Sequence, residues 1–310
     1  MSRVAVVDVG TNSTRLLIAD VAPDGRIEEL ERRTTITRLG QGVDHSATLA
    51  PAAMERVFAA LDTYKKLIDA HGVSATTAVL TSAVRDATNG ADFTATIRAR
   101  FGLDAHTISG DDEARLTFRG ATSDRDPADH RRLAVFDVGG GSTELVVGRD
   151  GQVAFHVSTQ AGVVRQTERF LRHDPPAPEE LQLLAAEAAE IFAAAVPDTV
   201  RASVEAGIAV AGTATSAASI LQELEPYDPA RVHGFRLLRA QCEMLLARLA
   251  EMTEARRREV TGLHPDRAPA IVAGLILLIE AMRAFDLDEV EVSEHDILRG
   301  AALDRPAASA

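Results

Sequence analysis

The order of apolar and polar positions predicts strands and helices that alternate along the whole chain. Short apolar runs bounded by polar turns are typical of buried strands, and we expect strands at 4–7, 15–21, 27–37, 75–81, 103–108, 208–211 and 290–292. Apolar residues spaced three and four apart are typical of helices with one buried face, and we expect helices at 51–72, 93–101, 111–116, 178 onward, 237–250, 268–285 and 297–303. This alternation predicts an α/β protein.

The most informative pattern is an internal repeat. Residues 4–20, VAVVDVGTNSTRLLIAD, align with residues 133–149, LAVFDVGGGSTELVVGR, at a fixed offset of 129, and eight of the seventeen aligned positions are identical. An aspartate–glycine turn follows each copy. The period is too long for a solenoid, so we expect a duplicated domain. The polar segment 122–132, which contains Pro127, is predicted to be a linker or hinge.

Each copy of the repeat places an aspartate at the end of a strand, followed by glycine and small polar residues. These aspartates are Asp8 and Asp137. Glycine lets the backbone approach a ligand closely, and consecutive N–H groups in such a turn form a concavity for an anion. Carboxylates at strand ends suit a hydrated magnesium ion bound together with phosphate. The alternative is a pair of ordinary β-hairpin turns, which the duplication disfavours.

Three further positions are candidates for chemistry. Glu144 follows the second loop where the first copy has Arg15, and it is either a catalytic or metal-orienting carboxylate or a surface residue of a strand. Arg85 closes a strand and is expected in a loop, where it could grip phosphate or remain solvated. Glu113 lies beside Asp111 and Asp112 at a helix start. The helix dipole accounts for such acids, and Asp111 is the expected N-cap.

Composition restricts the class of partner. The chain has 310 residues and a net charge of −13, which argues against a nucleic-acid binder. A polyanionic substrate would therefore need a local basic or metal-filled site. The candidate basic residues are Arg85, Arg115, Arg119 and Arg165.

The single cysteine and the hydropathy predict a cytoplasmic location. Cys242 is expected to be buried, and one cysteine permits no internal disulfide, which suits a reducing compartment. The longest apolar run, residues 273–279, is too short to span a membrane, and no signal peptide is visible. We therefore expect no membrane partner.

Seven motifs together resemble the exopolyphosphatase / guanosine pentaphosphate phosphohydrolase (Ppx/GppA) family, in its short form. In chain order they are DVGTNST at 8–14, RLGQG at 38–42, TSAVRDATN at 81–89, SGDDEARLTF at 109–118, DVGGGSTE at 137–144, AGTATS at 211–216 and DRAPAIVAG at 266–274. The resemblance spans nearly the whole chain. It implies an α/β fold of two duplicated ribonuclease H-like (actin/sugar kinase-like) domains with an interdomain cleft. We expect domains at 1–124 and 125–294, with a helix in about 295–310 that packs back on the first.

The resemblance also implies roles for the residues that match its motifs. Glu113 would be the catalytic base that activates water, while Asp137 and Glu144 would be catalytic and would hold magnesium, or manganese. Asp8 would serve the metal side of the first loop. The terminal phosphates would be held by Asn12, Ser13, Arg85, Gly139, Gly140 and Ser142. Hydrolysis of a phosphoanhydride needs charge neutralisation and an aligned water, so this set is chemically sensible.

Two stretches depart from the family pattern. Position 112 is Asp where Glu is common, which leaves Glu113 as the expected base. Residues 292–300 read VSEHDILRG, where many members have a small residue followed by Leu-Arg-Glu-Gly. The long members carry a further helical region after this point, and without it we expect a preference for short polyphosphate chains.

The expected function is phosphoanhydride hydrolysis that releases orthophosphate from inorganic polyphosphate. Hydrolysis of pppGpp to ppGpp is an alternative that the sequence does not separate. A kinase or ATPase of the same fold is a second alternative, because fold does not fix function. A non-catalytic sensor of pppGpp or polyphosphate is a third, disfavoured by the retained acids Asp8, Glu113, Asp137 and Glu144. A homodimer is expected.

Overall fold

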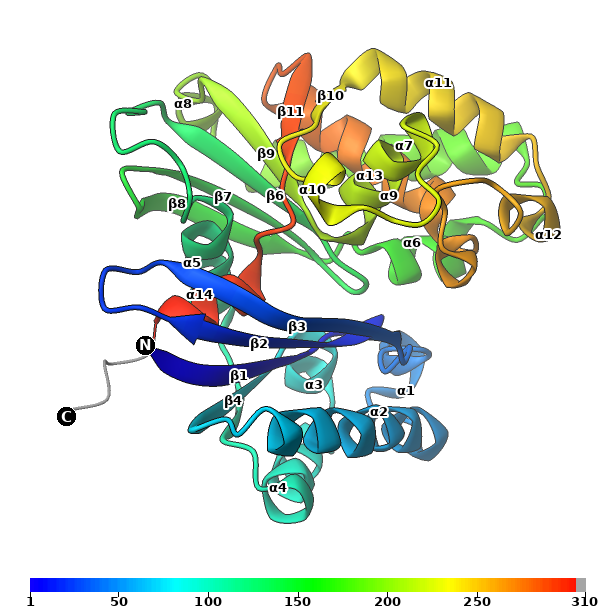
Figure 1. Ribbon diagram of the computed structural model, residues 1–310. Coiled ribbons are helices and arrows are strands. Elements are labelled where there is room, and N and C mark those ends of the chain that lie inside the picture. The colour runs from blue at the N-terminus through cyan, green and yellow to red at the C-terminus, as the bar shows by residue number, and fades with distance from the viewer. Residues whose placement is uncertain (305–310) are drawn as a thin grey trace. The chain divides into compact units, whose positions relative to one another are not determined.

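The computed structural model describes residues 1–304, with Asp44 described by its backbone only, and it divides into two compact units (Figure 1). Of the described residues, the first unit comprises 1–120 and 297–304, and the second comprises 121–296. The chain therefore passes between the units twice, at 120/121 and at 296/297. Of the segment 295–310 that was expected to form a C-terminal helix, residues 305–310 lie outside the described part.

A five-stranded sheet in the order β3-β2-β1-β4-β5 forms the centre of the first unit. Its strands are β1 (Ser2–Val9), β2 (Ser13–Val21), β3 (Ile27–Ile36), β4 (Ala75–Leu80) and β5 (Ala105–Thr107). The central strand β1 runs antiparallel to β2 and parallel to β4. The three antiparallel strands form a meander, and β4 and β5 extend the sheet in parallel.

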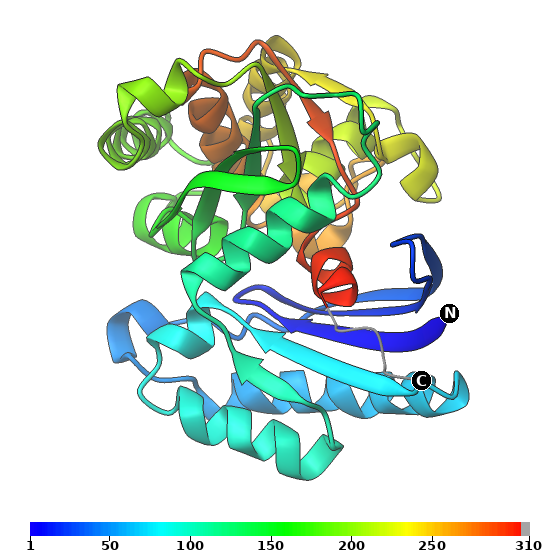
Figure 2. The same cartoon turned by 90° about the vertical axis from the view of Figure 1, so that its left-hand side faces the viewer.

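Helices cover both faces of this sheet (Figures 1 and 2). They are α1 (Val43–Ser46), α2 (Pro51–Ala70), α3 (Ser82–Asp86), α4 (Gly90–Phe101), α5 (Gly110–Ala121) and α14 (Ile297–Leu303). Side chains alternate along β1, so Ala5 and Val7 pack against α2 and α4, whereas Val4 and Val6 pack against α14 and Leu116 of α5. Asp8 shares the parity of Val4 and Val6 and therefore points to the face of α5 and α14.

The second unit repeats this plan with a six-stranded sheet in the order β10-β11-β9-β6-β7-β8. Its strands are β6 (Leu133–Val138), β7 (Thr143–Arg149), β8 (Gln152–Thr159), β9 (Ala206–Val210), β10 (Arg236–Leu238) and β11 (Glu289–Val292). β6 pairs antiparallel with β7 and parallel with β9, as β1 does with β2 and β4. Even the register shifts are repeated, because those at Ile18/Ala19 and at Val147/Gly148 lie 129 positions apart. The predicted duplication and the α/β class are confirmed.

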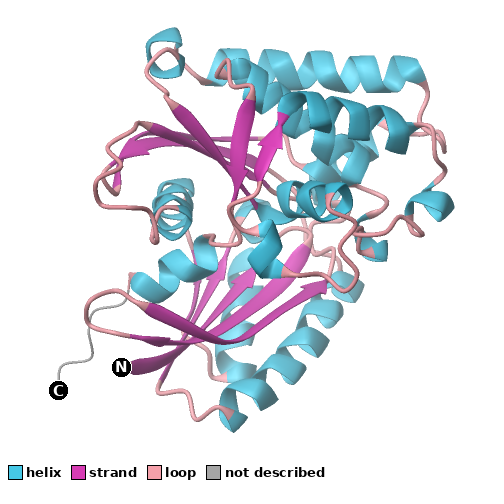
Figure 3. Cartoon of the chain, turned by 45° about the horizontal axis from the view of Figure 1, so that its top comes forward, coloured by secondary structure: helices cyan, strands magenta, loops and turns pink. Residues whose placement is uncertain are grey.

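The core of the second unit lies between its sheet and a group of helices (Figure 3). They are α6 (Val163–Phe170), α7 (Pro178–Ala195), α8 (Asp198–Arg201), α9 (Ala211–Leu221), α10 (Pro229–Val232), α11 (Arg239–Ala250), α12 (Glu254–Arg257), the 3-10 helix η1 (Pro265–Arg267) and α13 (Ile271–Ala284). α13 is buried over almost its whole length, which its nearly continuous apolar sequence explains. Cys242 is buried as predicted, and burial raises the pKa of its thiol to about 12.

Three local predictions are wrong. Helix α5 begins at Gly110, and Ser109, not Asp111, caps it, because the Asp112 N–H donates to the Ser109 hydroxyl at 3.1 Å. Arg85 lies in the last turn of the short helix α3 and not in a loop. Strand β10 takes the first residues of the region expected to be helical from 237. No helix in residues 1–304 combines the length and the apolar content that crossing a membrane requires.

Candidate active site

The first candidate loop is a tight turn between β1 and β2. The Gly10 N–H donates to the Ser13 carbonyl at 2.9 Å, and a Cβ at Gly10 would lie 3.2 Å from that oxygen. The carbonyl of Asn12 accepts the N–H groups of Thr37 and Arg38 at 3.0 and 2.9 Å, which ties the loop to the segment after β3. The backbone thus holds the turn, and the side chains of Asn12 and Ser13 remain half-buried within it.

Asp8 lies directly opposite Arg15 across β1 and β2. Its side chain is buried, and Oδ2 accepts hydrogen bonds from Nε and Nη2 of Arg15 at 2.8 and 2.6 Å. A charge-assisted pair of this kind is strong when it is shielded from water. The first hairpin therefore supplies the counter-charge for its own aspartate.

Glu113 and Arg85, expected as base and phosphate ligand, are in direct contact. Arg85 donates through Nη1 to Oε2 of Glu113 at 2.9 Å and to the carbonyl of Ile108 at 3.1 Å. Burial raises the pKa of Glu113 above its usual value. The hydrogen bond from Arg85 opposes that rise, and the charges of Asp8 and Asp86 add to it. A buried carboxyl with a raised pKa is suited to general base catalysis. Asp8, Arg85 and Glu113 thus form one electrostatic group in the first unit.

The second candidate loop, between β6 and β7, has the same turn. The Gly139 N–H donates to the Ser142 carbonyl at 3.0 Å, and a Cβ at Gly139 would lie 3.0 Å from that oxygen. These two residues correspond to Gly10 and Ser13 at the offset of 129. The two loops that the repeat predicts therefore share their backbone hydrogen bond as well as their sequence.

Helix α6 supports this second loop, a contact that the sequence reasoning missed. The carbonyls of Gly139 and Gly140 accept the N–H groups of Val163 and Val164 at 2.9 and 2.8 Å. The loop therefore satisfies donors that the first turn of a helix leaves open. The approach requires Gly162, where a Cβ would lie 2.2 Å from the carbonyl carbon of Gly141. That lone glycine before an amphipathic run is the signal that could have revealed the contact.

Asp137 and Glu144 face each other across β6 and β7. They are 9% and 2% exposed, so Glu144 is not the surface residue that was one of its two interpretations. Oε1 of Glu144 accepts hydrogen bonds from the hydroxyls of Ser142 and Ser158 at 2.6 and 2.8 Å. Like charges placed directly opposite each other destabilise an antiparallel pair. Asp137 and Glu144 offer only carboxylate oxygens as metal ligands. Magnesium prefers oxygen ligands, so these residues fit the predicted ion.

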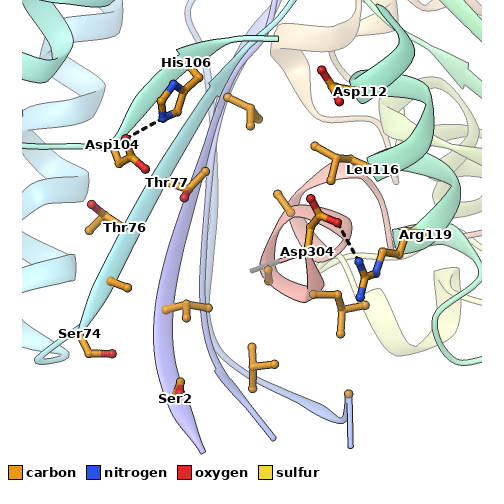
Figure 4. Close-up of a pocket in the computed structure, with 18 of the residues that line it drawn as sticks. Ser2, Ser74, Thr76, Thr77, Asp104, His106, Asp112, Leu116, Arg119 and Asp304 are labelled. Carbon is orange, nitrogen blue, oxygen red and sulfur yellow. Dashed lines mark hydrogen bonds and ion pairs between the residues drawn. The ribbon is translucent and has the colours of Figure 1, made fainter. Parts of the chain in front are cut away.

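All four candidate basic residues contact groups of their own unit, and the contacts of Arg85 are described above. Arg115 and Arg119 of α5 both bind the carboxylate of Asp304, which follows α14, and Arg165 donates to the carbonyl of Gly141 at 2.9 Å. Arg115, Arg119 and Asp304 line a cavity of about 1130 Å³ in the first unit (Figure 4). Among the described residues, the lining of this cavity includes none of the predicted site residues.

Comparison with known proteins identifies the family. Residues 17–304 match the Ppx/GppA phosphatase family. The chain belongs to this family. It is 38% identical to exopolyphosphatase 2 of Mycobacterium tuberculosis over 315 aligned residues, which cover 98% of each chain.

Solved structures of Ppx/GppA proteins have the same fold. The structure of an exopolyphosphatase from Cytophaga hutchinsonii matches with a TM-score of 0.87 at 26% identity, over 98% of each chain. A Ppx/GppA family member from Aquifex aeolicus matches with a TM-score of 0.81 at 30% identity, over 97% of this chain and 96% of that one. The predicted family, the two-domain actin-like fold and the class of phosphoanhydride hydrolase are confirmed. The roles of the individual residues stay predictions.

Proposed function

We propose that this protein is an exopolyphosphatase that releases orthophosphate from the ends of inorganic polyphosphate. The observation that carries the reaction is the buried Glu113 held 2.9 Å from Arg85 at the start of α5. The choice of substrate rests on the 38% identity to exopolyphosphatase 2 over nearly the full length of both chains. Hydrolysis of pppGpp is the alternative, because it breaks the same kind of bond.

In this proposal Glu113 accepts the proton of the attacking water. Its burial removes competing hydration and raises its pKa toward the pH at which a base works best. Arg85 orients the Glu113 carboxylate, and its planar guanidinium has further N–H donors for the terminal phosphate. The backbone N–H groups of both loops, with the side chains of Asn12, Ser13 and Ser142, would complete the phosphate contacts. Gly140 would offer its N–H, whereas the Gly139 N–H is held by the Ser142 carbonyl, so Gly139 would contribute by letting the phosphate approach the backbone closely.

Asp137 and Glu144 would hold the magnesium ion, and manganese would suit the same oxygens. Bound there, the ion would neutralise charge on the phosphate oxygens. Asp8, whose Oδ2 is engaged by Arg15, is proposed to act on the metal side through ordered water. We further propose that the enzyme works in the cytoplasm as a homodimer.

A paired assay tests the proposal. Phosphate release from polyphosphate and from pppGpp is measured with magnesium for the wild type, Glu113→Gln and Asp112→Asn. We expect faster release from polyphosphate, and a general base accounts for roughly 10²–10⁴-fold in rate, so Glu113→Gln should fall by that order. Asp112 is exposed in the same helical turn, and its variant should keep its activity.

Each other outcome has a distinct meaning. Full activity of Glu113→Gln would show that the base is assigned wrongly. Faster release from pppGpp would select the alternative substrate. Tight binding of either compound without any phosphate release would identify a sensor in place of an enzyme.

A further inference from the structure

Two histidines and an aspartate cluster in the second unit, close in sequence to both points where the chain passes between units. Asp124 lies four residues after Gly120, where the chain leaves the first unit. His295 lies two residues before Ile297, where the chain returns to it. His233, which directly follows α10, is the third member. The cluster thus joins two chain segments that are far apart in sequence, and it includes none of the predicted site residues.

The three side chains have the spacing of metal ligands. Oδ2 of Asp124 lies 2.8 Å from Nε2 of His233 and 3.3 Å from Nδ1 of His295. One ligand atom from each residue lies within 4.8 Å of the other two. In a tetrahedral zinc site with bonds of about 2.0–2.1 Å, neighbouring ligand atoms are about 3.3 Å apart. Small side-chain movements would therefore bring all three atoms into one coordination sphere.

Burial and charge at the cluster also favour a cation. Nδ1 of His295 is buried, makes no well-formed hydrogen bond within the described residues and faces Oδ2 of Asp124 at 3.3 Å, so this nitrogen is directed into the cluster. Glu291 and Glu294 lie close enough to His233 to act on it electrostatically. With Asp124, they place three carboxylates near His233, of which Glu291 is paired with Arg125 at 3.3 Å. The side chains of Asp124 and His233 are 36% and 27% exposed, which leaves an ion a route from solvent.

We propose that Asp124, His233 and His295 bind a first-row transition-metal ion such as Zn²⁺, at a site separate from the magnesium site. Imidazole nitrogen suits zinc, cobalt and nickel, whereas magnesium prefers oxygen ligands alone. Asp137 and Glu144 offer only oxygens, so the two sites differ in the ion they select. Three protein ligands leave a fourth position for water. The proposal does not depend on the substrate of the enzyme.

Metal binding at this site would break one hydrogen bond, between the N–H of Glu294 and His233. The N–H of Glu294 donates to Nδ1 of His233 at 3.3 Å, so a neutral His233 carries its proton on Nε2 and donates it to Asp124. A metal ion takes the place of that proton, which moves to Nδ1 and opens the contact with Glu294. This contact is longer than a typical hydrogen bond, so its loss is a small penalty. A bound ion would link the segment that contains Asp124 to the segment that contains His295.

Cobalt tests the site directly, because Co²⁺ absorbs visible light when nitrogen and oxygen ligands surround it tetrahedrally. The full-length protein is titrated with Co²⁺ in excess Mg²⁺, which occupies the oxygen-only site, and Zn²⁺ is then added as a competitor. We expect one equivalent to bind, Zn²⁺ to displace it, and Zn²⁺ to raise the thermal midpoint. The double variant His233→Gln/His295→Gln should lose all three effects, and Glu144→Gln should keep them.

Other results would overturn the proposal. Absence of the cobalt spectrum in a folded wild type excludes the site, and a spectrum that survives in the double variant places the ion elsewhere. If the double variant does not fold, Asp124→Asn retains the shape of the cluster, and binding weakened by at least about tenfold supports the assignment. An unchanged affinity in Asp124→Asn contradicts it.

Discussion

Arg15 and Glu144 occupy equivalent positions in the repeat, yet they give the two hairpins opposite electrostatics. Arg15 places a guanidinium 2.6 Å from Asp8, whereas Glu144 places a second carboxylate opposite Asp137. A bound cation is therefore expected to stabilise the second hairpin far more than the first. The duplication conserved the turn and changed the charge, which is how two similar loops come to have different chemistry.

Magnesium should therefore stabilise the protein through Glu144. We expect Mg²⁺ to raise the thermal midpoint of the wild type and to leave that of Glu144→Gln nearly unchanged. Without Mg²⁺ the variant should melt at a higher temperature than the wild type, because it removes like-charge repulsion. Differential scanning calorimetry with and without saturating Mg²⁺ measures both effects. Asp150→Asn, an exposed acid in the turn between β7 and β8, is the control, and a full magnesium shift in Glu144→Gln would contradict the assignment.

The acid limb of the activity profile should report Glu113. Burial raises the pKa of this carboxyl above its usual value of 4.5, and a base must be ionised to work. We expect kcat/KM to fall as pH decreases through that raised pKa, at a higher pH than for an ordinary glutamate. A pH series of initial rates measures the limb. An activity that stays constant down to the usual glutamate pKa would exclude Glu113 as the base.

The raised pKa of Glu113 also changes how the stability of the protein depends on pH. Folding favours the protonated form of Glu113, so stability falls as the pH rises from the usual pKa of the carboxyl through the raised one, and the full cost remains at higher pH. Glu113→Gln should therefore increase the free energy of unfolding at neutral pH while it lowers the rate of hydrolysis. The gain should disappear below the usual pKa of the carboxyl, and urea unfolding at several pH values measures it. A variant less stable than the wild type at neutral pH would show that the pair with Arg85 outweighs burial.

At the residue scale the sequence located the acids but not their environment. Asp111, Asp112 and Glu113 follow one another, and only the fold shows that Glu113 is 7% exposed while the other two face solvent. Motif resemblance selected Glu113 because the residue pattern alone could not. The contact of Arg85 with Glu113 was also beyond prediction, because it joins positions 28 apart in the chain.

At the scale of elements, α14 holds α5, the helix that carries Glu113. A Cβ at Gly300 would lie 1.8 Å from the carbonyl oxygen of Leu116, so the two helices approach each other at backbone contact. Asp304 adds ion pairs to Arg115 and Arg119 at the end of α14. The position of α5 therefore depends on a helix from the other end of the sequence.

Gly300→Ala should destabilise the protein although alanine is the better helix former. Alanine gains about 1 kcal/mol of helix propensity over glycine, but its Cβ would force α14 away from α5. Asp304→Asn breaks only exposed ion pairs and should cost less than about 1 kcal/mol. Chemical unfolding of the two variants, with kcat as a second readout, measures the difference. Equal stability of Gly300→Ala and the wild type would show that the helices separate without cost.

Periodic patterns predicted the long elements well, because an amphipathic helix or a buried strand records its own environment. The pattern did not reveal α3, α6 or β10, which are short, so that packing decides their conformation. Support of the second loop by α6 depends on Gly162 meeting Gly141, a contact between segments that periodicity does not report.

At the scale of the whole molecule, the two units differ in how the chain builds them. The second unit is one uninterrupted segment with its own large core, whereas the first needs α14 from beyond that segment. The internal repeat predicted two domains. The late return of the chain was expected from the family resemblance and not from the repeat, because the aligned stretches 4–20 and 133–149 end long before α14.

Residues 121–296 should therefore fold alone, and residues 1–120 should not. Without α14, the sheet face that carries Val4, Val6 and Leu17 is exposed to water. Circular dichroism and thermal unfolding of each fragment measure the difference. Residues 1–120 joined by a short linker to 297–304 form the control, which should recover a cooperative transition. An equally cooperative transition in 1–120 alone would show that α14 is dispensable.

The position of α14 at the end of the sequence also delays completion of the first unit during synthesis. A ribosome that adds roughly 5–20 residues per second needs about 10 to 35 s to make the segment 121–296 that separates α5 from α14. Throughout that time the sheet face of the first unit that α14 later covers remains exposed. The second unit, residues 121–296, can fold as soon as it has been synthesised. The protein is therefore assembled out of order, and the helix that positions the proposed base is added after the second unit has been made.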